Sequence, residues 1–242
     1  MSEVSGPGGS AIDATSLPPI DLVWQSLSGP LAPFAHRRGG AVILDAEVGI
    51  FGALDDQHDP AAWRALADLL GPAGAIGLFP LEVPAPPGWG ETFRLAGVQM
   101  VGEGVEGRRR SDVLDMGPGD VDDVLDLVER TRPGPFARRT IELGGYVGLR
   151  DDGRLVALSG RRLATDTHVE VSAVCVDPDR RRGGLARVLV EAVVAGIIEE
   201  GRVPMLHAAA SNTNAIALYE AMGFTISRRF DFVGVQAPAG DT

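Results

Sequence analysis

The chain has 242 residues, is 45% hydrophobic and carries a formal net charge of −11 at pH 7. The apolar content suffices for one large core or two small ones. The acidic excess argues against nucleic acid as a partner, because phosphate binding requires many basic contacts. Every cation in the chain is an arginine. Any anion site must therefore use arginine side chains or backbone N–H groups.

Several protein classes are disfavoured by what the sequence lacks. Cys175 stands alone, so no disulfide framework is expected, and a reducing, cytoplasmic environment fits. There is no run of about 18 apolar residues, so we expect neither a membrane span nor a membrane partner. No group of His, Cys, Asp and Glu has the spacing of metal ligands, so no metal is expected. The sequence leaves the oligomeric state open.

The N-terminal half shows structural patterns but no chemical motif. Residues 1–19 are rich in Gly, Ser and Pro and lack the features of a signal peptide, which predicts a disordered arm. Residues 20–105 are predicted to form a smaller α/β half without cofactor motifs. Its expected elements are a helix over 21–27, a helix that starts after Asp59-Pro60, and strands over 41–44, 75–79 and 95–101.

A polar, Gly-rich stretch over 102–110 reads as a linker, and residues 111–242 are predicted to form the catalytic domain. The order of elements in this domain is β-α-β-β-β-α-β-α-β, which predicts an α/β fold with a mixed sheet. Expected strands cover 111–114, 145–150, 154–159, 168–177, 203–209 and 224–235, and expected helices start at Asp120 and cover 184–199 and 213–222.

The strongest chemical signal is a strand that ends at Val176 and runs into an Arg- and Gly-rich turn before a long amphipathic helix. The start of a helix presents unpaired N–H groups and the positive end of the helix dipole, which together attract anions. Glycines at 183 and 184 allow the backbone to approach a ligand closely. An ordinary strand-to-helix turn with exposed arginines is the alternative. The turn lacks the Gly-Lys-Ser/Thr ending of a nucleotide P-loop and the glycine pattern of a dinucleotide fold.

The spacing Arg181-x-x-Gly184-x-Ala186 resembles the Arg/Gln-x-x-Gly-x-Gly/Ala signature of the GNAT superfamily of N-acyltransferases. A second segment, residues 212–224, is similar to that family's Asn-x-x-Ala-x-x-Leu-Tyr-x-x-x-Gly-Phe element. Here Ala215, Leu218 and Met222 share one helical face, and a glycine stands where a helix commonly ends. The two motifs together are far more specific than either alone.

The resemblance implies a GNAT-type mixed β-sheet flanked by helices, preceded by the smaller N-terminal half. The pattern around residues 132–136, 145–146 and Gly153 looks most like the branch related to glycine N-acyltransferases. By analogy with that branch, residues 20–105 would be a degenerate copy of the fold. The sequence itself shows only that this half lacks the motifs.

The resemblance also implies a co-substrate, acetyl-CoA, and a role for each motif residue. The turn would hold the pyrophosphate of the coenzyme, and the strand edge would pair with its pantetheine amides. A backbone N–H at Val174 would polarise the thioester carbonyl, and Tyr219 would protonate the leaving thiolate. The residues expected to bind the cofactor are Val174, Val176, Arg181, Arg182, Gly183, Gly184, Leu185, Ala186, Arg187 and Asn212.

Glu170 is the candidate base, because some family members carry their catalytic glutamate at this offset. It precedes Val174 by four residues, or roughly 13 Å along a strand, so it must act through water or across a bulge. A glutamate on a solvated sheet face is the alternative. His168 and His207 are further candidates, and His207 should lie near the thioester. Cys175 should point away from Val174 and be a buried apolar residue.

Acyl transfer from acetyl-CoA to a primary amine of a small molecule or peptide by direct attack is the expected function. A domain that senses coenzyme A without turnover is the alternative, and it would need neither Tyr219 nor Glu170. A purely structural partner domain has no positive support. The acidic chain favours a cationic acceptor, but the sequence names neither the acceptor nor the acyl-chain preference.

Overall fold

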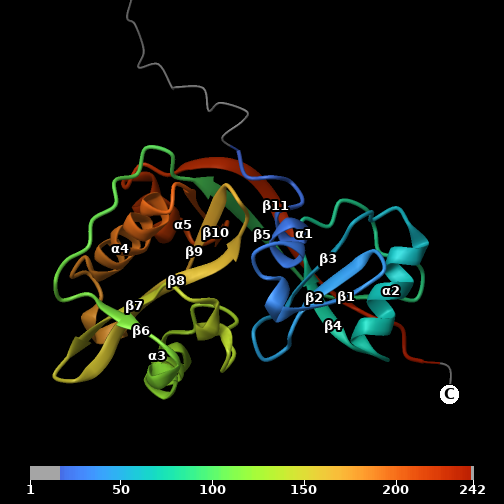
Figure 1. The fold of residues 1–242 in the computed structure, drawn as a ribbon, viewed down its shortest axis with the longest axis horizontal. Helices are drawn as coiled ribbons and strands as arrows, with labels where there is room; N and C mark the ends of the chain where they lie inside the picture. Colours follow the sequence, from blue (N-terminus) through green and yellow to red (C-terminus); the bar gives the residue numbers. More distant parts are fainter. Residues whose placement is uncertain (1–16, 241–242) are drawn as a thin grey trace, which may run out of the picture.

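The computed structural model describes residues 17–240, which form one continuous mixed sheet of eleven strands with helices against its faces (Figure 1). Most of the predicted arm, residues 1–16, lies outside the described residues. The strands follow the order β1-β2-β3-β4-β11-β5-β10-β9-β8-β7-β6. The mixed sheet flanked by helices that the sequence predicted is confirmed. No helix in the described part of the chain has the length and apolar character of a membrane span.

The N-terminal half supplies four short strands and one long one. Its second helix begins where Asp59 caps the N–H of Ala61 and Pro60 takes the first helical position, and Ala62, Trp63 and Leu66 are buried. Its elements are α1 (Leu22–Ser28), η2 (Ala32–Phe34), β1 (Ala35–Arg38), β2 (Ala41–Leu44), β3 (Phe51–Leu54), α2 (Pro60–Leu70), β4 (Ala75–Leu78) and β5 (Gly90–Val101).

The C-terminal half follows the predicted order closely, except that its first strand starts three residues later than expected. Helix α4 packs its apolar stripe on β8 and β9, and five of its large apolar side chains are buried. The elements are β6 (Leu114–Met116), η3 (Pro118–Asp120), α3 (Val121–Thr131), η4 (Thr140–Leu143), β7 (Tyr146–Asp151), β8 (Arg154–Ala164), β9 (His168–Val176), η5 (Pro178–Arg180), α4 (Leu185–Glu199), β10 (Val203–Ala209), α5 (Thr213–Glu220) and β11 (Thr225–Gln236).

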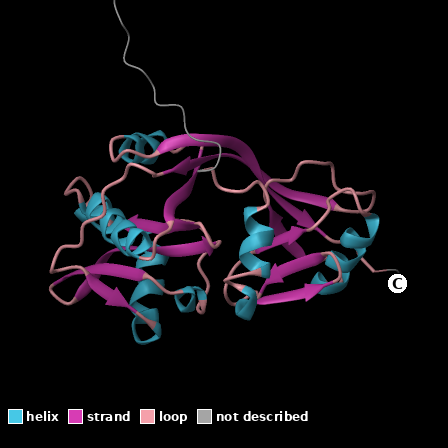
Figure 2. Ribbon diagram, turned by 45° about the horizontal axis from the view of Figure 1, so that its top comes forward, coloured by secondary structure: helices cyan, strands magenta, loops and turns pink. Residues whose placement is uncertain are grey.

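Two long strands join the halves (Figure 2). β5 pairs with β11 along its length and with β10 near its end, while the last residues of β11 pair with β4. The sequence predicted β5 only from residue 95, because 90–94 are exposed and lack an apolar pattern. Backbone pairing with β11, rather than side-chain burial, makes that segment a strand.

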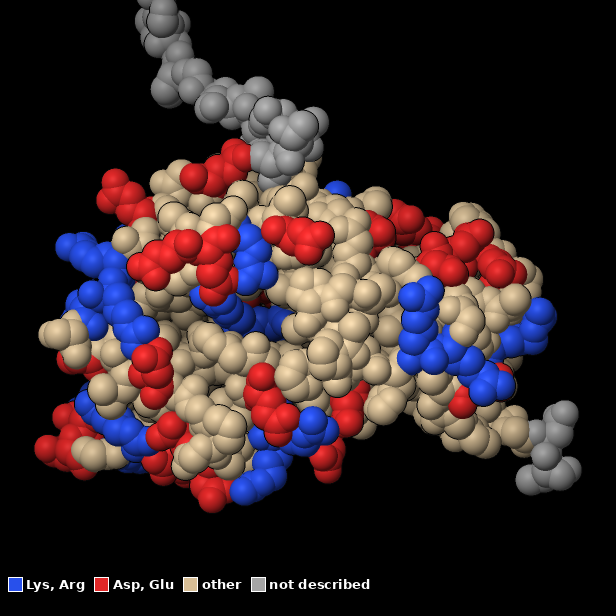
Figure 3. Space-filling model, in the orientation of Figure 1, with Lys and Arg blue, Asp and Glu red and all other residues tan. Residues whose placement is uncertain are grey.

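The sheet separates apolar cores on its two faces. One core packs α4 and α5 against the strands, and a second packs α3 against the opposite face. Two further clusters fill the N-terminal half, and one of them reaches Leu163 of β8 and Met205 of β10. The N-terminal half therefore covers part of the central strands on the side away from α4. On the face in Figure 3, arginine and acidic side chains are intermixed.

Candidate active site

The site begins with a fork between two parallel strands. β9 and β10 pair from His168 opposite Val203 to Val171 opposite Leu206. Beyond that point β9 pairs only with β8, and β10 pairs only with β5. Backbone groups on the inner edges of the two strands are thus left without a strand partner at their carboxyl ends. Open α/β sheets bind ligands at such ends.

A bulge shapes the β9 arm of the fork. Leu158 faces Cys175 and Gly160 faces Ser172, so β9 has one residue more than β8 in this interval. Ala173 lies in the bulge with φ +53, which is uncommon for a residue other than glycine. Bulges re-aim side chains and are frequent beside active sites. A bulge thus interrupts the strand between Glu170 and Val174, which is one of the two arrangements, bound water or a bulge, expected for Glu170.

The Arg/Gly turn is anchored at its first residue. The carboxylate of Asp177 is buried, accepts the N–H of Asp179 and forms an ion pair with Arg130 of α3. Further on, Arg182 and Gly184 adopt left-handed backbone conformations, with φ +67 and φ +75. These two positions turn the chain into α4, whose first N–H groups have no partner within the helix.

A groove of about 620 Å³ joins this turn to the fork and to α5. Within the described residues, neither Arg181 nor Arg182 has a carboxylate within ion-pair distance, so their charge is free for a ligand. Free cations at a helix start fit a diphosphate. The groove is lined by Thr131, Arg132, Pro133, Val174, Cys175, Val176, Arg180, Arg181, Arg182, Gly184, Leu185, Ala186, Arg187, Asn212, Asn214, Ala215, Leu218 and Tyr219.

Of the ten residues expected to bind the coenzyme, all except Gly183 line this groove. Gly183 lies between two residues that do, so its contribution would come from the backbone. Asn212 caps α5 through its side-chain oxygen, which accepts the N–H of Ala215 at 3.3 Å. Its amide N–H groups are left to donate to a ligand. The two motifs, about 30 residues apart in sequence, are thus brought to one cavity.

Tyr219 is the aromatic side chain in the groove. It is 7% exposed and packs edge-to-face on Phe224, with ring centroids 6.0 Å apart. Burial raises the pKa of Tyr219 to about 12. The phenol therefore keeps its proton at neutral pH, which is the condition for acting as a general acid.

Glu170 lies away from the groove, on the sheet face opposite α4. Its neighbours Val169 and Val171 belong to the α4 core, and side chains alternate along a strand. The carboxylate is 1% exposed and accepts bonds from Arg162 Nε at 2.8 Å, from the N–H of Leu163 at 3.2 Å and from His207 Nδ1 at 2.7 Å. Burial alone would raise the pKa of Glu170, but Arg162 and then His207 outweigh it and hold the pKa well below its usual range.

Of the two candidate histidines, His207 contacts Glu170, whereas His168 bonds elsewhere. The His207 ring lies between Glu170 and Gln99, whose amide nitrogen is 3.1 Å from Nε2, and Gln99 Oε1 accepts from Ser227 at 3.2 Å. His168 begins β9 and bonds Thr167 at 2.8 Å, outside the groove.

Cys175 lies in the α3 core, whereas Val174 and Val176 pack on the α4 core, so its predicted direction is confirmed. Burial raises the pKa of the Cys175 thiol, which suits an apolar role.

Sequence reasoning missed three polar side chains that extend the contact between Glu170 and His207. Arg162 pairs with Glu170, while Gln99 and Ser227 continue the contact across β5 and β11. A signal existed for Gln99, which interrupts an apolar strand, whereas Arg162 lies beyond the strand predicted over 154–159. A polar side chain inside an apolar strand has to find a buried partner, but the sequence does not say which one.

Comparison with known proteins identifies the family. The FR47-like protein family model matches residues 146–233. The crystal structure of an acetyltransferase described as GNAT-family, from Novosphingobium aromaticivorans, is 36% identical, with a TM-score of 0.82, and the match covers 89% of this chain and 96% of that one. A GCN5-related N-acetyltransferase from Kribbella flavida shares the fold, with a TM-score of 0.60 at 16% identity over 90% of this chain and 95% of that one.

Curated relatives match about a third of this chain. The [ribosomal protein bS18]-alanine N-acetyltransferase of Salmonella typhimurium is 37% identical over 83 residues, which is 33% of this chain and 55% of that protein. The chain thus spans about half the length of such relatives. The 36% identity to the Novosphingobium protein over nearly its whole length nevertheless shows the class: this chain belongs to the GNAT family of acetyltransferases.

Proposed function

We propose that this chain transfers the acetyl group of acetyl-CoA to a primary amine by direct attack. One observation carries the proposal: the Arg/Gly turn, the forked strand end and Tyr219 line a single groove. The groove supplies free cations for phosphates, strand-edge groups for amides and a neutral phenol for a thiolate. A domain that only senses coenzyme A would have no use for the phenol, and the acetyltransferase relatives do not favour it.

Each part of the groove has a proposed task toward acetyl-CoA. The backbone of residues 182–187 holds the pyrophosphate at the start of α4, and the Arg181 side chain, which bonds the carbonyl of Val176 at 3.3 Å, shapes the turn. The free edge of β9 up to Val176 pairs with the pantetheine amides. Asn212 donates to the coenzyme from α5. No metal enters the proposal.

The chemistry then requires three protein groups. The backbone N–H of Val174 polarises the thioester carbonyl at the bulge, so that negative charge can develop on its oxygen. The amine nitrogen forms the new C–N bond, and the C–S bond breaks with its electron pair going to sulfur. Tyr219 gives its proton to that thiolate. The amine must lose a proton, for which Glu170 stays the candidate base.

For Glu170 to take a proton directly, Arg162 or His207 has to release it, because both carboxylate oxygens are engaged. Its lowered pKa also makes it a weak base. Replacing Glu170 should therefore reduce the rate less than replacing Tyr219 does.

A peptide or protein N-terminus is the proposed acceptor, with small-molecule amines as the second class. Support comes from curated relatives that are named [ribosomal protein bS18]-alanine N-acetyltransferase, whereas another relative is named mycothiol acetyltransferase. We also propose that the chain falls in the branch related to glycine N-acyltransferases, on the pattern over residues 132–136. The division at about residue 105 and the absence of a cofactor site in the N-terminal half belong to the same proposal.

The test is turnover measured as release of free coenzyme A thiol, with acetyl-CoA and a panel of amines. The panel comprises peptides with free N-termini, the same peptides with blocked N-termini, polyamines and amino acids. Thiol release that requires a free amine, with a matching mass increase of the acceptor, supports the proposal. Acetyl-CoA binding without thiol release for any amine would make the chain a sensor.

A further inference from the structure

We infer that His207 is the group that takes the proton from the acceptor amine, and that Glu170 is the positioning residue that holds it. This inference rests on the proposed acetyl transfer. It changes the proposed role of Glu170 from base to anchor and gives the reaction a second catalytic side chain beside Tyr219.

Topology places His207 at the reacting end of the fork. The last pair between β10 and β9 joins Leu206 to Val171, so His207 is the first residue of β10 past that pair. The opposite arm carries the bulge at Ala173 and the proposed carbonyl-polarising N–H at Val174. The side chain of His207 lies on the face opposite α4, beside Glu170. The inferred reaction therefore has the amine attack the thioester from that face, on which His207 lies.

The hydrogen bonds of His207 fix which nitrogen is the base. A carboxylate whose pKa is held low stays ionised and can only accept, so Nδ1 carries the hydrogen that it donates to Glu170. Nε2 is then a lone pair, and the amide nitrogen of Gln99 donates to it at 3.1 Å. A carboxylate behind an imidazole holds the ring in one tautomer and stabilises its protonated form. For Nε2 to accept the substrate proton, the Gln99 amide has to give way to the amine N–H.

Charged groups approach His207 from three strands. Glu170 faces it from β9, Arg162 stands behind Glu170 on β8, and Arg228 from β11 shares a small cavity with the ring. β5 contributes the uncharged Gln99. The remaining neighbours are aromatic: Phe79, Phe230 and Phe232 pack edge-on, with ring centroids 5.2, 5.3 and 6.0 Å away.

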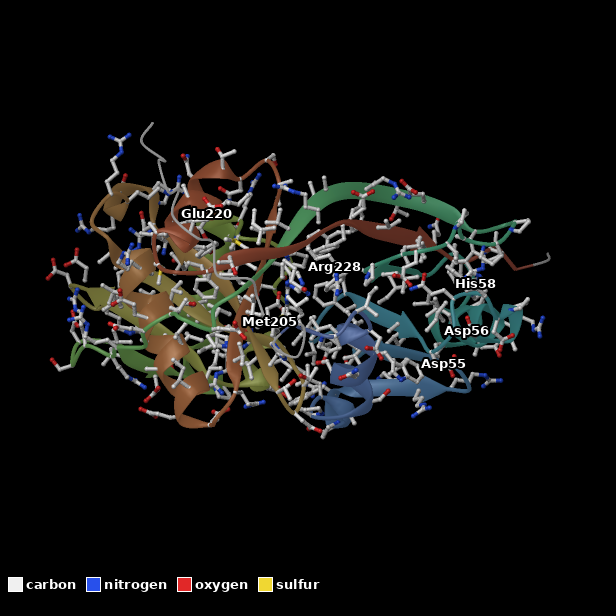
Figure 4. All side chains as sticks on the ribbon, turned by 90° about the horizontal axis from the view of Figure 1, so that it is seen from above. Asp55, Asp56, His58, Met205, Glu220 and Arg228 are labelled. Carbon is white, nitrogen blue, oxygen red and sulfur yellow. The ribbon has the colours of Figure 1, made fainter. Side chains whose placement is uncertain are left out.

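A space of about 10 Å³ adjoins the His207 ring and is lined in part by residues of the N-terminal half. The small cavity against the ring is walled in part by Ile20, Phe79 and Pro80, and these three residues also line a larger cavity of about 340 Å³. Asp55, Asp56 and His58 belong to the larger cavity, and Figure 4 shows them on the N-terminal half, with Arg228 between them and Glu220. With Asp21 and Glu82 the larger cavity holds four carboxylates, which attract a protonated amine.

The proposed step balances without a further reactant. The amine nitrogen attacks the carbonyl carbon, and its extra proton moves to Nε2 of His207. The hydrogen on Nδ1 of His207 stays there and remains hydrogen-bonded to the Glu170 carboxylate. The C–S bond breaks, and the thiolate takes the proton of Tyr219. The products are the N-acetyl amine and coenzyme A thiol. His207 then returns its proton to solvent, and Tyr219 takes one back.

The test compares pH–rate profiles of kcat/KM for the full chain, His207→Gln, Glu170→Gln and the matched control His168→Gln, which replaces an equally buried histidine of β9. His207→Gln should lower kcat about 10²-fold or more and remove the acid limb, with acetyl-CoA affinity unchanged. Glu170→Gln should keep an acid limb but move it to lower pH, because the imidazolium loses its carboxylate. His168→Gln should stay within about threefold of the parent in kcat.

A base at Glu170 would give the reverse pattern: Glu170→Gln would remove the limb and His207→Gln would leave it. That result overturns the inference, as does a loss below about threefold in His207→Gln. If His207→Gln does not fold, ¹⁵N-histidine NMR of the parent decides, since His207 must titrate at the midpoint of the kinetic acid limb. If the His207 chemical shifts do not change around that pH, the inference is overturned. A parent without turnover refutes the proposed function, and this inference falls with it.

Discussion

Charged side chains are exposed and unpaired with carboxylates on one side of the fork, in the described part of the chain, and paired on the other side. On the groove side, Arg181 and Arg182 are exposed and have no carboxylate partner in the described part of the chain. On the other side, the side chains of Glu170 and His207 are buried, and Arg162 and His207 both bond to Glu170. Charges left free in water can bind a ligand, whereas buried charges must pair and so fix geometry. One side is therefore suited to hold an anionic coenzyme, and the other to hold a side chain in a defined position.

The largest expected effect lies on the groove side, at Tyr219. Tyr219→Phe keeps the ring and its packing on Phe224, so folding and acetyl-CoA affinity should change little. Loss of the proton donor should lower kcat by about 10²–10⁴-fold. Steady-state kinetics on any accepted amine measures this. A fall of less than about threefold, together with an unchanged pH profile, would leave Tyr219 as packing alone.

The next largest expected effect is a loss of stability when the ion pair between Arg162 and Glu170 is broken. Arg162→Met leaves the Glu170 carboxylate buried without its cation, which should cost about 3–5 kcal/mol of unfolding free energy. Urea unfolding at neutral pH measures the loss, and Arg162→Met combined with Glu170→Met is the control that should recover part of it. A loss below about 1 kcal/mol would mean that the pair contributes no more than an exposed ion pair does.

The ion pair between Arg162 and Glu170 also predicts how the stability of the fold depends on pH in the acidic range. The pKa of Glu170 is lowered in the folded chain, so its contribution is fully present above the usual Glu pKa of about 4.3 and is lost as pH falls through the lower folded pKa. The parent should therefore lose stability steeply below about pH 4, and Glu170→Gln should show a shallower decline. The urea midpoint of unfolding is measured as a function of pH for the parent and for Glu170→Gln. Equal slopes for the two proteins would show that Glu170 does not take up a proton on unfolding.

A smaller effect tests the turn itself. Gly184 has φ +75 and open space around it, so Gly184→Val is strained by the backbone rather than by contacts. Acetyl-CoA at 100 times Kd should stabilise the parent by about 2.7 kcal/mol, and this gain should disappear in the variant. Gly153 has φ +82, equal free space and a place outside the groove, so Gly153→Val is the matched control. A gain retained in Gly184→Val would move the coenzyme away from the turn.

The smallest expected effect is an absence in the N-terminal half. Residues 20–105 contain neither motif, so calorimetry should find one acetyl-CoA site per chain. Two sites per chain would show that the N-terminal half also binds the coenzyme.

Local patterns determined much of this protein from the sequence. The Arg/Gly turn, the Asn-to-Phe helix and the order of elements over residues 111–242 follow from apolar periodicity and from glycine and capping positions, which act over a few residues. These signals predicted the fold and the groove side of the site, where motif residues contact a ligand through backbone and exposed side chains. They also predicted that Cys175 faces away from Val174, because alternation along a strand is local.

Only the tertiary structure decided the buried side. Glu170 was recognised as a candidate, but Arg162 and Gln99 were not, and the contact between Glu170 and His207 joins residues 37 positions apart. Pairing of β9 with β10, and its end at Leu206, sets that contact. The same holds for residues 90–94, which are strand because β11 pairs with them. Strand pairing depends on backbone groups that every residue carries, so the sequence contains the motifs but does not state which strands meet.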